Sequence, residues 1–409
     1  MTSLAPAFPS ASVRIYAAFT VMAAAVLLVV VVLDFQLAAA QSFPSFVLDP
    51  GGFPVGRDFL NTWMGGRSAF SGGPADWFDF DVYMAALAKV TGIPGLAPMY
   101  WSYPPHLLFL IWPFGLLGFL PSYIAWCVAG LALYVWAAAS CGVERKYWPF
   151  LAVAPAVTVN IFLGQNGFLT AALLIGGLAN LDRRPILAGI LFGFLTIKPQ
   201  LGLLLPILLV LRGHWRVIGS AVVTTALLVA ATAAWLGPEI WMEYWRKVAP
   251  QQHELLEVAG VMGWPIVASA LINARLAGVP ADLAWVVQGV ASVSAVGAVV
   301  WTFWRKRDPV LSLALFVTAT FLFSPWIMNY DMVVFGWIVA LLRQRENETL
   351  ADQILSLALW MLPILMFPFG FAKMPIAGLI LPLFAARILW RLANDTSQPV
   401  SLATSPAST

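Results

Sequence analysis

Long apolar runs that return roughly every 20 to 30 residues constrain this chain more than any other feature of its sequence. About 20 consecutive apolar residues span a bilayer as an α-helix, which satisfies its backbone hydrogen bonds internally. Hydrophobic residues make up 61% of the chain and charged residues only 10%, which excludes a soluble globular protein. The pattern therefore predicts an all-α polytopic membrane protein.

The first apolar run, residues 15–40, admits two interpretations. The alanines at its end, Ala38 to Ala40, resemble a signal-peptide cleavage site. A signal core, however, has only roughly 7 to 15 apolar residues, whereas this run is long enough to span a bilayer. We therefore expect a retained first helix, with the amino terminus in the cytoplasm because Arg14 precedes it.

The segment 103–120, which contains Pro104, Pro105 and Pro113 and is followed by Pro121, decides the orientation of the helices that follow. If it crossed the membrane, the basic clusters at 144–146, 183–184 and 212–216 would face outward. If it lies along the outer interface, all three face the cytoplasm, as the positive-inside rule requires. We expect the interfacial arrangement. The net charge of +3 then reflects orientation, and no nucleic-acid partner is expected.

With this arrangement the runs predict about 12 transmembrane helices in a single domain, residues 1–393. A first outer loop, 42–121, would carry interfacial helices, and a second outer loop would cover 237–280. Residues 394–409, rich in Ser, Thr and Pro, are expected to form a disordered cytoplasmic tail. After the first helix, the spans are expected at 122–141, 147–163, 166–181, 186–197, 200–211, 214–236, 281–304, 309–323, 330–343, 352–371 and 373–391.

Two of these runs, 186–197 and 200–211, are too short to cross a bilayer at 1.5 Å per residue. Between them stands Lys198, followed by Pro199, which indicates a broken helical hairpin. A lysine at membrane depth is costly unless it lines a cavity and meets an anion. The alternative is that Lys198 extends along the helix surface to the lipid headgroups.

The longest polar interruption, residues 42–105, contains Arg57 and Asp58. A carboxylate at the edge of a hydrophobic body is costly without a partner or a chemical task, and we expect a task for Asp58. Further polar groups are expected on the same outer side: Tyr103, Gln165, Asn166, His253, Tyr330 and Asp331. Their convergence predicts a functional site.

Structural alternatives remain for these residues. Gln165 and Asn166 could cap helix ends, and His253 could be a solvated loop residue. Asp331 could pair with a nearby Arg. No phosphate-binding glycine loop or His-Glu-x-x-His helix is present, and three widely spaced histidines make a metal cluster unexpected. The sequence therefore implies neither a metal nor a cofactor.

Taken in order, the short motifs of residues 14–345 resemble family 87 glycosyltransferases of the GT-C superfamily. The motifs are Gly56-Arg57-Asp58, Tyr103-Pro104-Pro105, Gly164-Gln165-Asn166, Lys198-Pro199 and Ser324-Pro325. Members of this superfamily use polyprenyl-phosphate sugars, and they include mannosyltransferases of lipid glycan assembly. One departure is that relatives often have His-Tyr after the Ser-Pro motif, where this chain has Asn329-Tyr330.

The resemblance implies a general base at Asp58 and a donor-phosphate contact at Lys198, and the need for cations at the departing phosphate adds Arg57 as a second such contact. It also implies a metal-independent, inverting transfer of a glycosyl residue, mannose by analogy, from a polyprenyl-phosphate sugar to a lipid or glycan acceptor. The reaction would take place at the outer face of a bacterial cytoplasmic membrane. The alternative classes are a transporter or flippase of a lipid-linked sugar, which the broken hairpin and buried lysine would also suit, and a polymerase or ligase of surface polysaccharide.

Overall fold

The structure is a computed structural model that describes residues 11–39, 54–69, 75–93, 96–262, 265–304, 307–345 and 348–394. Within these ranges the regular elements are helices, apart from isolated antiparallel bridging such as that between Val267 and Met328. Most of the expected carboxy-terminal tail and part of the first outer loop, 40–53, lie outside the described residues.

Six helices in the described ranges are long and apolar enough to cross a membrane. They are α1 (Ala11–Ala39), α5 (Phe119–Ser140), α11 (Trp215–Leu236), α15 (Ala281–Trp304), α18 (Leu350–Phe371) and α19 (Ile376–Asn394). The elements η4 (Arg145–Tyr147) and α6 (Trp148–Ala152) meet α7 (Pro155–Leu163) at a 44° bend, and this bent pair makes a seventh span if it is counted as one. The multi-pass membrane class is therefore confirmed.

The remaining predicted spans are occupied by shorter helices. These are α8 (Gly167–Ala179), α9 (Pro185–Leu195), η5 (Pro199–Leu201), α10 (Leu205–Leu211), α16 (Pro309–Phe323), η7 (Asn329–Met332) and α17 (Val333–Arg343). Each expected run is thus helical, but helices of this length do not by themselves establish a crossing. The total of about 12 crossings stays a prediction.

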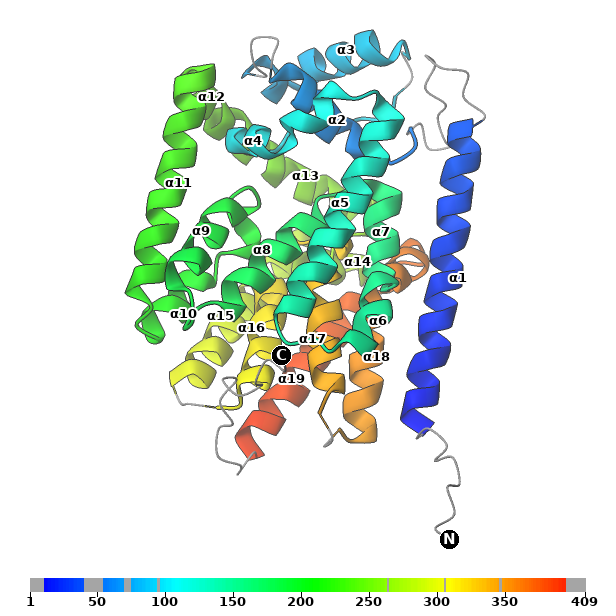
Figure 1. Ribbon diagram of the computed structural model, residues 1–409, viewed down its shortest axis with the longest axis vertical. Helices are drawn as coiled ribbons and strands as arrows, with labels where there is room; N and C mark the ends of the chain where they lie inside the picture. The colour runs from blue at the N-terminus through cyan, green and yellow to red at the C-terminus, as the bar shows by residue number, and fades with distance from the viewer. Residues whose placement is uncertain are drawn as a thin grey trace, which may run out of the picture.

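Short helices gather at one end of the molecule, away from the end where α1 begins (Figure 1). From the first outer loop come α2 (Phe59–Ser68), η1 (Ala75–Phe78), α3 (Phe80–Thr91), η2 (Pro105–Leu107), α4 (Leu108–Ile111) and η3 (Trp112–Leu116). From the second come α12 (Glu239–Glu243), the π-helical η6 (Tyr244–Val248), α13 (Ala249–Met262) and α14 (Ala270–Leu276). We call the end that carries α2, α3, α4 and α12 the loop end.

The segment 103–120 is broken into three short helices, η2, α4 and η3, and does not form one continuous helix. It packs on α2, and the backbones of Gly66 and Gly115 approach so closely that a Cβ at Gly115 would overlap the backbone of Gly66 and Arg67. Because this packing needs two glycines, α2 and η3 form one tightly apposed unit at the loop end.

The centre of the bundle is α17, which is buried from Val333 to Leu342. Ion pairs fasten the end of the bundle that lies away from the loop end. Arg345 donates to both carboxylate oxygens of Asp308 at 2.6 and 2.7 Å, and Arg387 donates to Asp352 at 2.8 Å. These pairs join the ends of α16, α17, α18 and α19.

Candidate active site

Asp58 ends a sharp turn that leads into α2. Gly56 and Arg57 both have positive φ angles, 70° and 38°, so this turn is strained at Arg57 and suits glycine at position 56. The Asp58 backbone N–H donates to the Leu163 carbonyl at 3.1 Å. A Cβ at Gly164 would overlap the Gly56 carbonyl oxygen, so the two glycine motifs predicted from the sequence pack backbone against backbone.

Gln165 holds the Asp58 side chain. Its Nε2 donates to Asp58 Oδ2 at 2.7 Å, while its Oε1 lies 3.5 Å from the hydroxyl of Tyr103. The indole N–H of Trp126 donates to the Gln165 carbonyl at 3.2 Å, which fixes the residue that carries this amide. The structure therefore brings together Asp58, Tyr103 and Gln165, three of the residues predicted for the site.

Burial raises the pKa of Asp58 above its ordinary value. The hydrogen bond from Gln165 and the charges of Arg57 and Lys198 lower it again, but they offset only part of the burial effect. Because the hydrogen-bond donor is a neutral amide, the carboxylate stays able to accept a proton.

Lys198 follows α9 and lies buried beside η7. Its ammonium forms an ion pair with Asp331 and lies 3.5 Å from Asn166 Oδ1 and 4.3 Å from the centre of the Tyr330 ring. The side chains of Lys198 and Asp331 are only 8% and 0% exposed. Lys198 therefore does not extend to the headgroups, and the partner of Asp331 is this lysine and not an arginine.

Asn160 joins the elements around this ion pair, although reasoning from sequence missed it. Its Nδ2 donates to the Tyr330 carbonyl at 2.7 Å, and its Oδ1 accepts from the Gly167 N–H at 2.9 Å. A Cβ at Gly167 would overlap the Tyr330 carbonyl oxygen and the Asn160 amide, so the start of α8 lies directly against η7. The signal available in the sequence was an asparagine within the mostly apolar run 155–163.

His106 is a second residue that the sequence did not point to. Its Nε2 lies 3.1 Å from Thr196 Oγ1, and its ring stacks on Trp241 with 5.6 Å between the ring centres. Burial lowers the pKa of His106 to about 4, so the imidazole is neutral near pH 7. His106 thereby links both outer loops to the turn that carries Lys198.

Two other predicted residues have different surroundings. The guanidinium of Arg57 lies over the Phe162 ring, 4.6 Å from its centre. His253, on α13, stacks on Trp285 and lies 3.5 Å from the Glu257 carboxylate. The His253 side chain is 63% exposed, and these partners are not the residues that surround Asp58 and Lys198.

Asn329, which follows the Ser-Pro motif, has a structural role in this chain. Asn329 is fully buried, and its Nδ2 donates to the Pro363 carbonyl at 3.0 Å. In this chain the residue therefore anchors η7 to α18. Among the residues that the structure describes, no three His, Cys, Asp or Glu side chains form a metal-ligating group.

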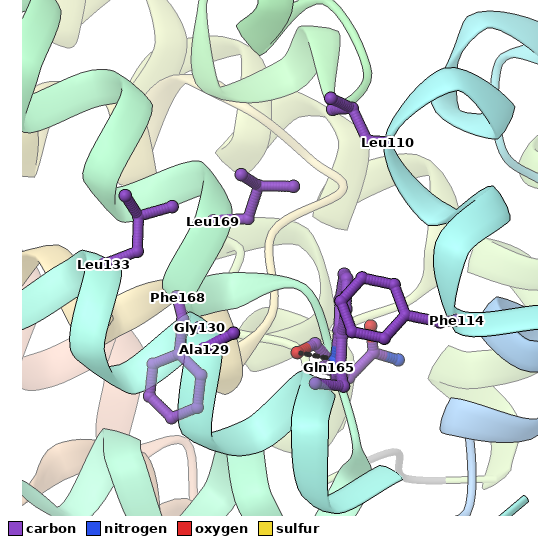
Figure 2. A pocket seen from close by; sticks show the side chains of 9 residues that line it. Leu110, Phe114, Ala129, Gly130, Leu133, Gln165, Phe168 and Leu169 are labelled. Carbon is purple, nitrogen blue, oxygen red and sulfur yellow. Dashed lines mark hydrogen bonds between the residues drawn. The ribbon is translucent and has the colours of Figure 1, made fainter. Parts of the chain in front are cut away.

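An apolar pocket reaches Gln165 from the side of the bundle, and Figure 2 shows the side chains that line it. Its walls come from α4, η3, α5 and α8, and Gln165 is the polar residue among them. The lining residues are Leu110, Phe114, Trp126, Ala129, Gly130, Leu133, Gln165, Phe168 and Leu169.

Taken together, the site presents a carboxylate of raised pKa and a buried ammonium close enough to lower that pKa. A carboxylate can take a proton from a hydroxyl group, and a desolvated ammonium can stabilise negative charge on a leaving group. The arrangement thus suits transfer of a group from an anionic carrier to a hydroxyl.

A family model for glycosyltransferase family 87 matches residues 101–325, which is more than half of the chain. Neither a curated protein nor a solved structure matches. The matched region contains Tyr103, Gln165, Asn166, Lys198 and His253, whereas Asp58, Tyr330 and Asp331 lie outside it. The chain belongs to glycosyltransferase family 87 and is a multi-pass membrane glycosyltransferase.

Proposed function

We propose that this glycosyltransferase takes its glycosyl residue, mannose, from a polyprenyl-phosphate sugar and transfers it to a hydroxyl of a lipid or glycan acceptor. The observation that carries the proposal is that the Asp58 carboxylate, held by Gln165, lies close enough to the buried Lys198 ammonium to feel its charge. The acceptor oxygen forms a bond to the anomeric carbon, the bond from that carbon to the phosphate oxygen breaks, and the acceptor proton passes to Asp58. A single displacement of this kind inverts the anomeric carbon.

Asp58 acts as the general base in this proposal. A carboxylate with the ordinary pKa of about 3.9 is a weak base for a hydroxyl group. Burial raises the pKa of Asp58, which brings its proton affinity closer to that required near neutral pH. The Gln165 amide orients the Asp58 carboxylate through a hydrogen bond and does not neutralise its charge.

Lys198 receives the leaving phosphate in this proposal. An ammonium has three N–H groups, and Asp331 and Asn166 accept two of them. The third can turn to a phosphate oxygen. Asp331 keeps the lysine charged at this depth, because an isolated buried ammonium would lose its proton. Arg57 supplies a second cation beside Asp58.

The proposed side of the reaction is the outer face of the bacterial cytoplasmic membrane. The basic residues Arg145 and Lys146 lie just before α6, and Arg212 and Arg216 flank the start of α11. Both helices begin away from the loop end (Figure 1). Because Lys and Arg favour the cytoplasmic side, the loop end and its site would face outward.

The test is a transfer assay with purified protein in detergent and a membrane lipid extract as acceptor. Radiolabelled polyprenyl-phosphate mannose is compared with radiolabelled GDP-mannose at equal concentration. We expect label in the extract only from the lipid-linked donor. Transfer from GDP-mannose alone would contradict the proposed donor class.

A further inference from the structure

The pocket beside Gln165 is suited to a hydrocarbon chain. It has a volume of about 180 Å³, and its lining is apolar apart from Gln165. An apolar cavity of about 150 Å³ stays dry and takes up small hydrocarbons, so a space of this size and lining favours hydrocarbon over water.

The pocket opens through the flank of a candidate membrane span. Ala129 is exposed on α5, and Leu133, one turn further along the same helix, is 37% exposed. Both residues line the pocket (Figure 2). In a membrane the flank of such a helix faces lipid tails, so a chain can enter sideways without crossing water.

The polar end of the pocket is Gln165, which donates to Asp58, while neither Asp58 nor Lys198 lines the pocket itself. Gln165 lines the pocket and donates to the Asp58 carboxylate at 2.7 Å. The partners of Lys198, which are Asn166, Tyr330 and Asp331, do not line it. A chain seated in the pocket therefore places its head group beside the base.

We propose that this pocket binds the hydrocarbon chain of a lipid acceptor, so that the acceptor hydroxyl lies at Asp58. The inference rests on the proposed function, because it takes Asp58 as the group that receives the acceptor proton. It narrows the acceptor to a molecule with at least one alkyl or acyl chain. The polyprenyl chain of the donor lies elsewhere, on the Lys198 side.

The test uses methyl, octyl and dodecyl mannosides as acceptors, with polyprenyl-phosphate mannose near saturation. Ala129→Trp fills the pocket from its open side, and Leu133→Trp is a second variant that does the same. The matched control is Val128→Trp, because Val128 is 63% exposed on the same helix and does not line the pocket. Thermal unfolding of each variant checks that the protein is folded.

For the wild type and Val128→Trp, we expect kcat/KM to be about tenfold or more higher for the dodecyl than for the methyl mannoside, since each buried methylene contributes about 0.8 kcal/mol. For Ala129→Trp and Leu133→Trp, this preference falls at least fivefold. Their KM for the donor does not change. Micelle partitioning of the acceptors affects all the variants equally and does not produce this difference.

Three results overturn the inference. A wild type that uses methyl and dodecyl mannosides equally well, or an Ala129→Trp variant that matches Val128→Trp, refutes a chain-binding pocket and leaves the proposed function intact. A raised KM for the donor with an unchanged acceptor preference assigns the pocket to the polyprenyl chain instead. No transfer from the lipid-linked donor to the membrane extract overturns the proposed function, and the inference falls with it.

Discussion

Two aspartates at opposite ends of the bundle, Asp58 and Asp308, show how partners decide what a buried carboxylate can do. At Asp308, burial alone would raise the pKa, but the two hydrogen bonds from Arg345, the N–H of Leu311 and the Arg345 charge outweigh it and hold the pKa below its usual value. At Asp58, burial prevails over the Gln165 amide and raises the pKa. An arginine fixes a carboxylate as an anion, whereas a neutral amide leaves it able to bind a proton.

The two ion pairs, Arg345–Asp308 and Lys198–Asp331, differ in how far they are removed from water. Arg345 and Asp308 retain 28% and 12% exposure, so water still reaches them, and their pair fastens helix ends. Lys198 and Asp331 retain 8% and 0%. A pair so thoroughly removed from water contributes little net stability, so its burial points to a task other than fastening.

The largest expected effect distinguishes the two aspartates by activity. Asp58→Asn preserves the size of the side chain but removes the base, so the transfer rate should fall about 10²- to 10⁴-fold. Its Tm at pH 7 should be unchanged or higher, because a raised pKa means that the ionised carboxylate destabilises the fold above pH about 4. Asp308→Asn should show the reverse, with a lower Tm and a near-normal rate. Near-normal turnover by Asp58→Asn would break the comparison and move the base to another residue.

The second prediction concerns the buried pair. Lys198→Met leaves Asp331 as an unpaired buried anion, and the free energy of unfolding should fall by about 3 kcal/mol or more. The double variant Lys198→Met/Asp331→Asn removes both charges and should recover most of this stability. If the ammonium binds the donor phosphate, the KM of the double variant for the donor should remain above that of the wild type. Lys198→Arg should restore only part of the activity that Lys198→Met loses. Recovery of normal donor kinetics in the double variant would reduce the pair to a structural role.

The pH dependence of the rate sharpens the comparison further. The base must be ionised to act, so kcat/KM should fall by about tenfold per pH unit on the acid side, with an apparent pKa above 3.9. Gln165→Leu removes the hydrogen bond that lowers the pKa of Asp58, and should move this limb to still higher pH. The profile is measured from pH 3 to 9 at saturating acceptor. An acid limb at or below 3.9 in the wild type would contradict a tuned Asp58.

The smallest effect is expected at Arg345. Arg345→Met should lower the free energy of unfolding at pH 7 by about 1 kcal/mol and leave the rate unchanged. Because the pKa of Asp308 is lowered in the folded state, the stability gained from its ionised form is lost as pH falls through that pKa. The difference between the wild type and Arg345→Met in thermal unfolding should therefore shrink below pH about 4. A difference that does not decrease at all as the pH is lowered below 4 would show that packing, and not charge, accounts for it.

The sequence predicted the helices well because hydropathy and proline breaks are local properties. The broken hairpin around Lys198 and the interruption at 103–120 both appear where the prolines stand. The number of membrane crossings does not follow from these local properties. Segments such as 186–197 fold into helices shorter than a bilayer, and their depth depends on the neighbours that cover them.

The candidate site was predictable only in part. Asp58, Gln165 and Lys198 stand out in the sequence as polar residues within or beside apolar runs. Their partners do not, because Asp331 is 133 residues from Lys198, and only the fold brings the turn after α9 to Asp331. His253 stays a prediction, and its surroundings show that a place in the second predicted outer loop does not by itself bring a side chain beside Asp58 and Lys198.

The separation of Lys198 from its counter-ion also has a consequence for how the protein is made. Lys198 leaves the ribosome and enters the membrane 133 residues before Asp331 exists. During that interval the segment of α9 and α10 carries a cation that lacks its direct ion-pair partner, and hydrocarbon tolerates such a cation poorly. The hairpin can therefore take its final depth only after α16 and η7 have arrived. Biogenesis of the loop-end half of the enzyme is in this way completed by its carboxy-terminal helices.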